Sequence, residues 1–156
     1  MMISGTDTKS YLAIDYGRRR VGIAGCSGDV SIAFGITTLA INGLTDLFNQ
    51  LQPFLDDRSV TNVVLGFPIT LGDKPGMLKS EVLAVAEKLQ ERGYTVHLVD
   101  EALSSEKAGR KLRERGKKSQ KEDLDRAAAA LFLQEYLDGE IPELSTEEIE
   151  KLSVNH

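Results

Sequence analysis

The hydrophobic pattern near the N-terminus predicts three adjacent strands. Apolar and β-branched residues fill Tyr11–Asp15 and Arg20–Cys26. The four residues between these runs are typical of a tight turn, in which Gly17 is free to adopt a positive φ. Residues 32–41 predict a third strand, in which Gly35 is typical of a bulge. We therefore expect the chain to begin with an antiparallel meander.

From residue 44 onward the pattern changes between helical and extended periods. Apolar residues at three- and four-residue spacing predict helices over residues 44–55 and 78–89, the second ending at Gly93. Short apolar runs at 61–66 and 95–99 predict buried strands, separated from each other by a loop over 67–76 and the second helix. Ser104 or Ser105 can cap a third helix reaching about Arg115, and residues 124–137 predict a fourth. This order predicts an α/β fold with a mixed sheet and helices on its faces.

Length and composition indicate one globular domain. The chain has 156 residues, 41% of them hydrophobic and 28% charged. Its single cysteine, Cys26, excludes an internal disulfide and a cysteine zinc cluster, so we expect a cytoplasmic protein with Cys26 in the core. No apolar run approaches the roughly 18 residues of a membrane span. We expect a flexible segment 1–10, a domain over 11–138 and a solvated acidic tail 139–156.

The net charge of −5 conceals one basic segment. Residues 107–121 hold eight Lys and Arg against one acid, whereas residues 122–156 hold two against ten. We expect the basic segment to bind nucleic-acid phosphates through Arg110, Arg113, Lys117, Lys118 and Lys121. The first turn adds Arg18, Arg19 and Arg20, for which phosphate contact and a solvated turn are equally good interpretations. Alternation is expected to send Arg18 and Arg20 to one face and Arg19 to the other.

Three carboxylates are candidates for the chemistry. Asp15 ends the first predicted strand, Glu101 follows the last, and Asp125 opens the last helix on the face of Ala129 and Phe132. Carboxylates gathered at a sheet end suit Mg²⁺ or Mn²⁺. Each acid also has an ordinary structural interpretation, as a turn acceptor or a helix cap. His97 shares the strand side of Glu101 and is expected to be a satisfied core histidine or a supporting residue of the site.

Four segments together resemble the signatures of the YqgF/RuvX family. Residues 15–24 (DYGRRRVGIA) resemble D-x-G-x-[KR]-R-x-G-x-A, and residues 64–68 (VLGFP) resemble its G-x-P element, with a glycine-rich continuation at 72–76. Residues 99–101 (VDE) match its V-D-E element. Residues 125–137 (DRAAA…LQEYL) resemble its D-x-x-A-A…L-Q-x-Y-L helix. The resemblance runs in order from about Tyr11 to Asp138.

The resemblance implies a ribonuclease H-like fold, with a five-stranded mixed sheet, its first three strands antiparallel, and helices on both faces. It implies a metal-dependent nuclease that matures the 5′ end of 16S ribosomal RNA, or a Holliday-junction resolvase. The implied catalytic residues and metal ligands are Asp15, Glu101 and Asp125, with Asp15 bridging two Mg²⁺ or Mn²⁺ ions. The chain departs from the family at Ala102, where Arg is common, at Ser104-Ser105, where a Thr pair is usual, and at Thr70, where Asn is common. The first departure removes a phosphate-facing cation and leaves the three acids in place.

Three other functions compete with RNA cleavage. An ATP-using enzyme of the actin and hexokinase type shares the Asp-x-Gly hairpin, but builds its cleft from two such domains, which 156 residues cannot supply. A non-catalytic RNA-binding factor in ribosome assembly, bound to ribosomal particles, keeps the fold without the chemistry. A resolvase of branched DNA uses the same chemistry, and a four-way junction usually calls for a two-fold enzyme. The chain is therefore expected to be a monomer or a homodimer according to its substrate.

Overall fold

The computed structural model describes residues 10–26, 32–67, 75–100, 121–141 and 143–144. Its elements, in chain order, are β1 (Tyr11–Asp15), β2 (Arg20–Cys26), β3 (Ala33–Ala40), α1 (Leu44–Asp57), β4 (Asn62–Phe67), α2 (Pro75–Glu91), β5 (Thr95–Asp100) and α4 (Lys121–Leu137). The helix predicted after Ser104 lies outside the described residues, as do Thr70, Ala102 and the Ser104-Ser105 pair. Among the described helices, none is both long enough and apolar enough to span a bilayer.

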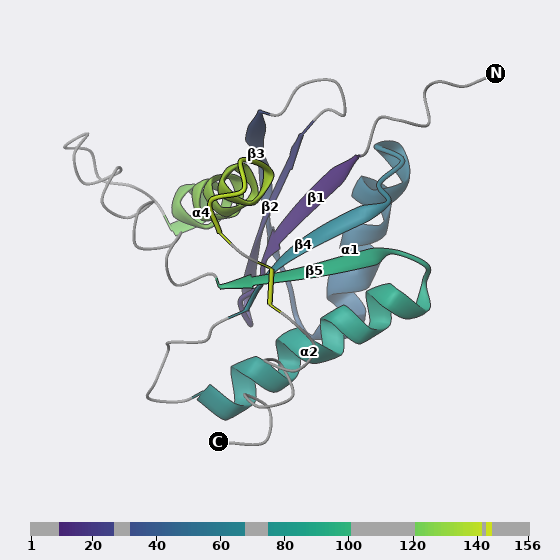
Figure 1. The fold of residues 1–156 in the computed structure, drawn as a ribbon. Helices are drawn as coiled ribbons and strands as arrows, with labels where there is room; N and C mark the ends of the chain where they lie inside the picture. Colours follow the sequence, from purple (N-terminus) through teal and green to yellow (C-terminus); the bar gives the residue numbers. More distant parts are fainter. Residues whose placement is uncertain (1–9, 27–31, 68–74, 101–120, 142, 145–156) are drawn as a thin grey trace.

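The strands form one mixed sheet in the order β3-β2-β1-β4-β5 (Figure 1). β1 pairs antiparallel with β2, and β2 with β3, while β4 runs parallel to both β1 and β5. The predicted mixed sheet with an antiparallel meander is therefore confirmed. Opposite Ile23 and Ala24, strand β3 carries one extra residue, Ile36, so the bulge expected at Gly35 lies directly beside it.

Helices cover both faces of the sheet and enclose two cores (Figure 1). On one face, α1 and α2 pack over a large aliphatic cluster that includes Leu12 and Ile14 of β1. On the other face, α4 packs over a smaller cluster that includes Ala13 of β1 and Ala129 of α4 itself. Because successive strand residues point to opposite faces, Asp15 shares the α4 face with Ala13.

Two helices begin earlier than their apolar residues predict. α2 begins at Pro75, not at Leu78, and proline suits a first helical position because no hydrogen bond is lost there. α4 begins at Lys121, not at Leu124, so Asp125 lies in the second turn and cannot be the N-cap. The predicted end of α2 is confirmed, since Gly93 has φ 99° and the Tyr94 amide donates to the carbonyl of Leu89 at 3.1 Å.

The glycine after Asp15 is required for a reason other than the predicted one. Gly17 does not have a positive φ, so the expectation of a left-handed turn is wrong. A Cβ atom at this position would instead lie 2.6 Å from the carbonyl oxygen of Arg20. The connection between β1 and β2 therefore folds so tightly that it leaves no space for a side chain.

The segment after α4 folds back onto the sheet. Gly139 has φ 76° and reverses the chain, and the Leu144 amide then donates to the carbonyl of Leu98 in β5 at 2.7 Å. Ile141 and Leu144 are both buried. The expectation of a solvated tail from residue 139 onward is therefore wrong for these two residues, whose apolar side chains pack against the fold. The packed chain extends at least to Leu144.

Candidate functional site

Three parallel strands end at the same edge of the sheet. Ile14 of β1 is level with Leu65 of β4, and the next β4 residue, Gly66, is level with Val99 of β5. Asp15 therefore ends β1 level with Val99, one residue before β5 ends at Asp100. β1 and β5 lie two strand spacings apart, or about 10 Å. Ligands in open α/β sheets bind at such an edge, beyond the strand carboxyl ends.

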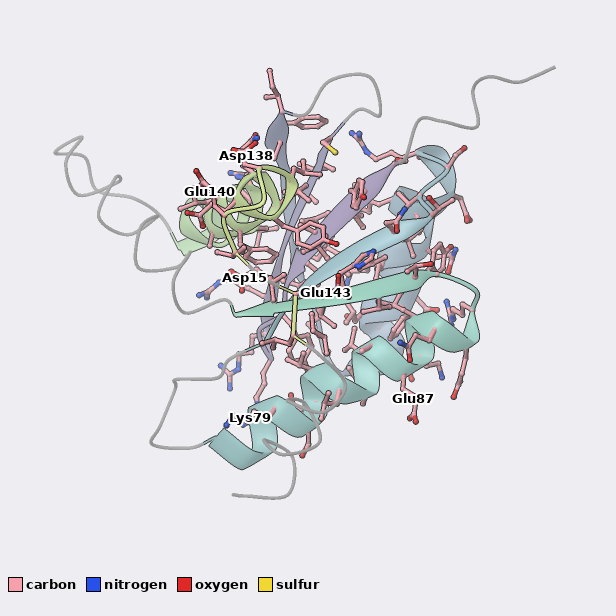
Figure 2. All side chains as sticks on the ribbon, viewed as in Figure 1. Asp15, Lys79, Glu87, Asp138, Glu140 and Glu143 are labelled. Atoms are coloured by element: carbon pink, nitrogen blue, oxygen red, sulfur yellow. The ribbon has the colours of Figure 1, made fainter. Side chains whose placement is uncertain are left out.

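Asp15 occupies this edge on the face that α4 covers. Its side chain is half-buried and has an interaction partner. Figure 2 labels it on the side of the sheet beneath α4, in agreement with the alternation along β1. A carboxylate at this depth is accessible to an ion or substrate while its backbone is held by strand pairing with Gly22.

The N-terminus of α4 points toward the same edge. Near its C-terminal end, Gln134 accepts a hydrogen bond from the Ala33 amide at 2.7 Å, level with the beginning of β1. Eight residues earlier, Arg126 packs against Gly35 so closely that a methyl group there would lie 3.3 Å from its Cγ atom. Because Gly35 is level with Ala13 in the middle of β1, α4 approaches the Asp15 end as it runs back toward its first turns.

The helix face that carries position 125 is the one that packs on the sheet. Ala129 and Phe132, four and seven residues later, are fully buried in the α4 core. The side chain of Asp125 and all of Glu101 lie outside the described residues. The described side chains alone contain no group of three or more potential metal ligands. The structure thus describes Asp15 itself, the helix α4 that contains position 125, and the strand β5 that ends just before Glu101.

The three arginines of the first hairpin do not share one environment. Arg18 forms an ion pair with Glu81 of α2, its Nε atom 3.1 Å from Oε2. Strand alternation in β2 puts Arg20 on the opposite, α4 face, with Ala24. The expectation that Arg18 and Arg20 share a face is wrong because residues 16–19 form a connection, to which strand alternation does not apply. Arg19 is exposed.

The basic segment predicted to bind phosphates is mostly outside the described residues. This holds for Arg110, Arg113, Lys117 and Lys118, while Lys121 is the first residue of α4 and its side chain is not described. Their contact with nucleic acid stays a prediction from the charge pattern.

A buried tyrosine beside Asp15 escaped the sequence interpretation. Tyr16 is only 7% exposed, and its hydroxyl donates to Oε1 of Glu81 at 2.8 Å. Burial, together with this bond and the negative charge of Glu81, raises the pKa of Tyr16 to about 12. The two residues are 65 positions apart, so no local pattern signals their contact.

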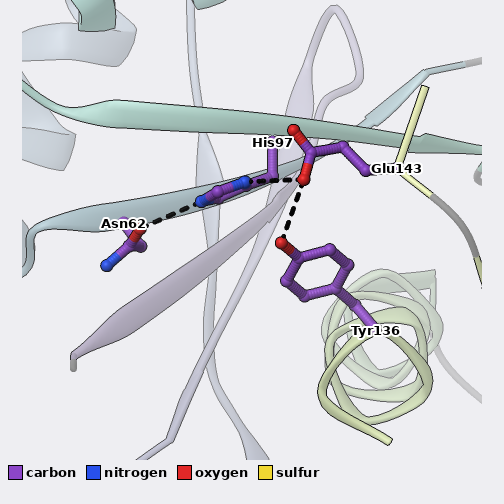
Figure 3. A network of polar contacts seen from close by, with 4 residues as sticks. All are labelled: Asn62, His97, Tyr136 and Glu143. Atoms are coloured by element: carbon purple, nitrogen blue, oxygen red, sulfur yellow. Dashed lines mark hydrogen bonds and ion pairs between the residues drawn. The ribbon is translucent and has the colours of Figure 1, made fainter. Parts of the chain in front are cut away.

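His97 is satisfied by two partners, as expected for a structural histidine. Its Nδ1 atom lies 2.9 Å from Oε1 of Glu143 and its Nε2 atom 2.9 Å from Oδ1 of Asn62 (Figure 3). The Tyr136 hydroxyl donates to the same Glu143 oxygen at 3.1 Å, and burial raises the pKa of Tyr136. This network connects α4, β4, β5 and the returning segment, and it lies toward the end of the sheet opposite Asp15.

The five-stranded mixed sheet with helices on both faces is a ribonuclease H-like fold, and comparison with solved structures agrees. RuvC from Thermus thermophilus in complex with a Holliday junction substrate is similar at a TM-score of 0.58 and 15% identity, covering 87% of this chain and 99% of that chain. A second RuvC structure from Thermus thermophilus is similar at a TM-score of 0.56 and 13% identity. At this identity the likeness supports the fold alone.

Sequence comparison identifies the family. The model of the RuvX family, described as Holliday junction resolvase, matches residues 9–139. Proteins named "Putative pre-16S rRNA nuclease" from Acaryochloris marina and Thermosynechococcus vestitus are 35% and 36% identical over 132 residues. These matches cover 83% of this chain and 92% and 87% of the relatives. The chain belongs to the RuvX family.

Proposed function

We propose that this chain is a metal-dependent nuclease that cleaves precursor 16S ribosomal RNA at its 5′ end. Family membership and the names of the similar cyanobacterial proteins support a nuclease with this substrate. The observation that carries the proposal is the position of Asp15, half-buried at the carboxyl edge of the sheet on the face toward which α4 brings position 125.

In this proposal Asp15, Glu101 and Asp125 hold two Mg²⁺ or Mn²⁺ ions. Val99 is buried beneath α4 on the same face of the sheet as Asp15, and Glu101 follows Val99 by two residues in the chain. The donor set consists only of carboxylate oxygens, which suits these hard ions. When bound, the ions activate water and stabilise the leaving oxygen of the phosphodiester. Asp15 would serve both ions, and Glu101 and Asp125 would each serve one.

In this proposal, basic residues of the first hairpin and of segment 107–121 bind the substrate. Arg19 is exposed on the hairpin beside Asp15 and is suited to contact the RNA backbone. The basic residues of segment 107–121 lie between Glu101 and Asp125 in the chain, which supports their use as a phosphate-binding arm. The substrate in the cytoplasm is then a precursor RNA within assembling ribosomal particles.

The test is cleavage of a labelled 5′ precursor fragment of 16S ribosomal RNA with Mg²⁺ or Mn²⁺, compared with EDTA. We expect cleavage by the parent chain and none by Asp15→Asn or Asp125→Asn, while both variants bind the RNA nearly as well as the parent. RNA binding without metal-dependent cleavage by the parent chain would instead identify a non-catalytic assembly factor. Cleavage by Asp15→Asn near the parent rate would refute the assignment of the acids.

The family description favours one alternative substrate, a Holliday junction. A four-way DNA junction assayed in parallel separates the two, since a resolvase makes paired cuts and generally works as a two-fold dimer. We expect the RNA to be cleaved in preference and the chain to be monomeric in sedimentation. Preferential, symmetric junction cleavage by a stable dimer would assign the resolvase function instead.

A further inference from the structure

We propose that Glu81 of α2 is a positioning residue for the metal site, which holds the Asp15 hairpin in place and keeps the Arg18 guanidinium away from the Asp15 carboxylate. The proposal rests on the proposed function, in which Asp15 is a metal ligand. Glu81 contacts two of the four residues that connect β1 to β2, accepting from the Tyr16 hydroxyl and pairing with Arg18.

Two bonds to one carboxylate join the hairpin to the opposite layer of the molecule. Oε1 of Glu81 is 2.8 Å from the Tyr16 hydroxyl, and Oε2 is 3.1 Å from Nε of Arg18. Tyr16 follows Asp15 directly and packs in the core beneath α1 and α2, whereas Asp15 faces α4. Fixing Tyr16 on one face therefore fixes the backbone from which Asp15 projects on the other.

The hairpin has little freedom to adjust by itself. The space at Gly17 is filled by the carbonyl of Arg20, and Asp15 remains paired with Gly22 across the turn. Arg18 lies at the tip, half-exposed, three residues from Asp15. Glu81 supplies a counter-ion for this cation, its Oε2 atom lying 3.1 Å from Nε of Arg18.

The charge of Glu81 has a second consequence for a divalent ion. With Glu81 in place, Arg18 and Glu81 form a neutral pair beside the sheet edge. Without it, the guanidinium adds an unpaired positive charge near the ion and competes for the same carboxylate oxygens. Both effects weaken metal binding, and both depend on Arg18. Removing Arg18 together with the Glu81 charge therefore relieves them.

The experiment measures Mn²⁺ binding directly, by the loss of the free Mn²⁺ signal in electron paramagnetic resonance, on the full chain. For Glu81→Gln, which keeps an acceptor for Tyr16, we expect about three- to tenfold weaker Mn²⁺ binding, the size of one unpaired charge in a partly exposed setting. The double variant Arg18→Gln/Glu81→Gln is expected to return to within about twofold of the parent. Thermal melting of every variant checks that the fold is retained.

Tyr136→Phe is the matched control for Tyr16→Phe. Each substitution removes a hydroxyl that donates to a glutamate, but Tyr136 lies near the far end of α4 from Asp125. We expect Tyr16→Phe to weaken Mn²⁺ binding about twofold, because the lost hydrogen bond acts on the metal only indirectly, through the position of the Asp15 backbone. Tyr136→Phe is expected to leave Mn²⁺ binding unchanged.

Asp15→Asn separates failure of this inference from failure of the proposed function. Parent-like Mn²⁺ binding by Asp15→Asn would overturn the metal site itself. If Asp15→Asn loses binding while Glu81→Gln binds as the parent does, or the double variant is no better than Glu81→Gln, the positioning role of Glu81 is refuted and the site stands.

Discussion

Replacing Gly17 with alanine tests whether the turn after Asp15 is held by close packing. The added Cβ would begin 2.6 Å from the Arg20 carbonyl oxygen, whereas real Cβ contacts stay beyond 3.0 Å, so the backbone must move by at least the difference. The oxygen belongs to the backbone at the start of β2, which cannot yield as a flexible side chain could. Forced overpacking of this kind costs about 1–3 kcal/mol of the free energy of unfolding.

Gly93→Ala is the matched comparison, because it lowers the free energy of unfolding through backbone conformation and not through a steric clash. Gly93 has φ 99°, and a Cβ there meets nothing within 4 Å. The expected cost is about 1 kcal/mol, since left-handed strain is partly offset by the lower entropy of the unfolded chain. At roughly 2–4 °C per kcal/mol for a chain of this size, a cost of about 2 kcal/mol for Gly17→Ala lowers the melting temperature by roughly 4–8 °C, about twice the effect of Gly93→Ala.

Differential scanning calorimetry of the two variants and the parent measures both shifts, and Mn²⁺ titration adds a second result. We expect Gly17→Ala to weaken Mn²⁺ binding as well, since the backbone shift begins two residues from Asp15, and Gly93→Ala to leave it unchanged. A Gly17→Ala protein that melts within about 1 °C of the parent would refute the close packing at Gly17, because such a shift corresponds to less than about 0.5 kcal/mol.

Three further predictions concern titration, reactivity and the length of the packed chain. The pKa of Tyr16 is about 12 in the folded protein and 10.0 in the unfolded chain, so the stability that Tyr16 contributes is intact below pH 10 and falls as pH rises toward about 12. Urea titrations of Tyr16→Phe should therefore show a smaller loss of stability at alkaline pH than those of the parent. Cys26 is 5% exposed and burial raises the pKa of its thiol, so Ellman's reagent should react slowly with native protein and rapidly in urea, and equal rates would contradict its burial. Truncation after Asp138 removes Ile141 and Leu144 and should cost about 3 kcal/mol or more, whereas truncation after Leu144 keeps both; equal melting temperatures would show that the returning segment does not stabilise the fold.

The fold could be predicted from the sequence because its strands and helices differ sharply in apolar period. The β1–β2 hairpin is an example, since two short apolar runs separated by a four-residue connection leave few other arrangements. The starts of α2 and α4 were missed by three residues each, because the apolar pattern detects the first buried position and not the exposed turn before it. Ile141 and Leu144 were missed because charge dominates the segment that surrounds them.

The candidate site shows a different limit. The edge position of Asp15 could be predicted because Asp15 ends a strand, and in an open α/β sheet the carboxyl ends of the parallel strands meet at one edge. The contact of Glu81 with Tyr16 and Arg18 joins segments more than 60 residues apart, and no periodicity within either segment contains that information. Gly17 shows the same limit locally, because a glycine required for space and a glycine required for positive φ are identical in sequence.

The central claim is that a carboxylate at position 125 meets Asp15 at the edge of the sheet. The most direct measurement compares metal-dependent cleavage of the 16S precursor by Asp125→Asn and Asp123→Asn, two variants with the same charge change in the same helix. Position 123 lies roughly 200° around the helix from position 125, away from the face of Ala129 and Phe132. We predict that Asp125→Asn loses more than about 100-fold in rate, because removing a metal ligand costs more than the roughly 10–100-fold lost when a residue that only hydrogen-bonds to a ligand is changed. Asp123→Asn is expected to stay within about threefold of the parent rate. Equal rates for the two variants would contradict the account.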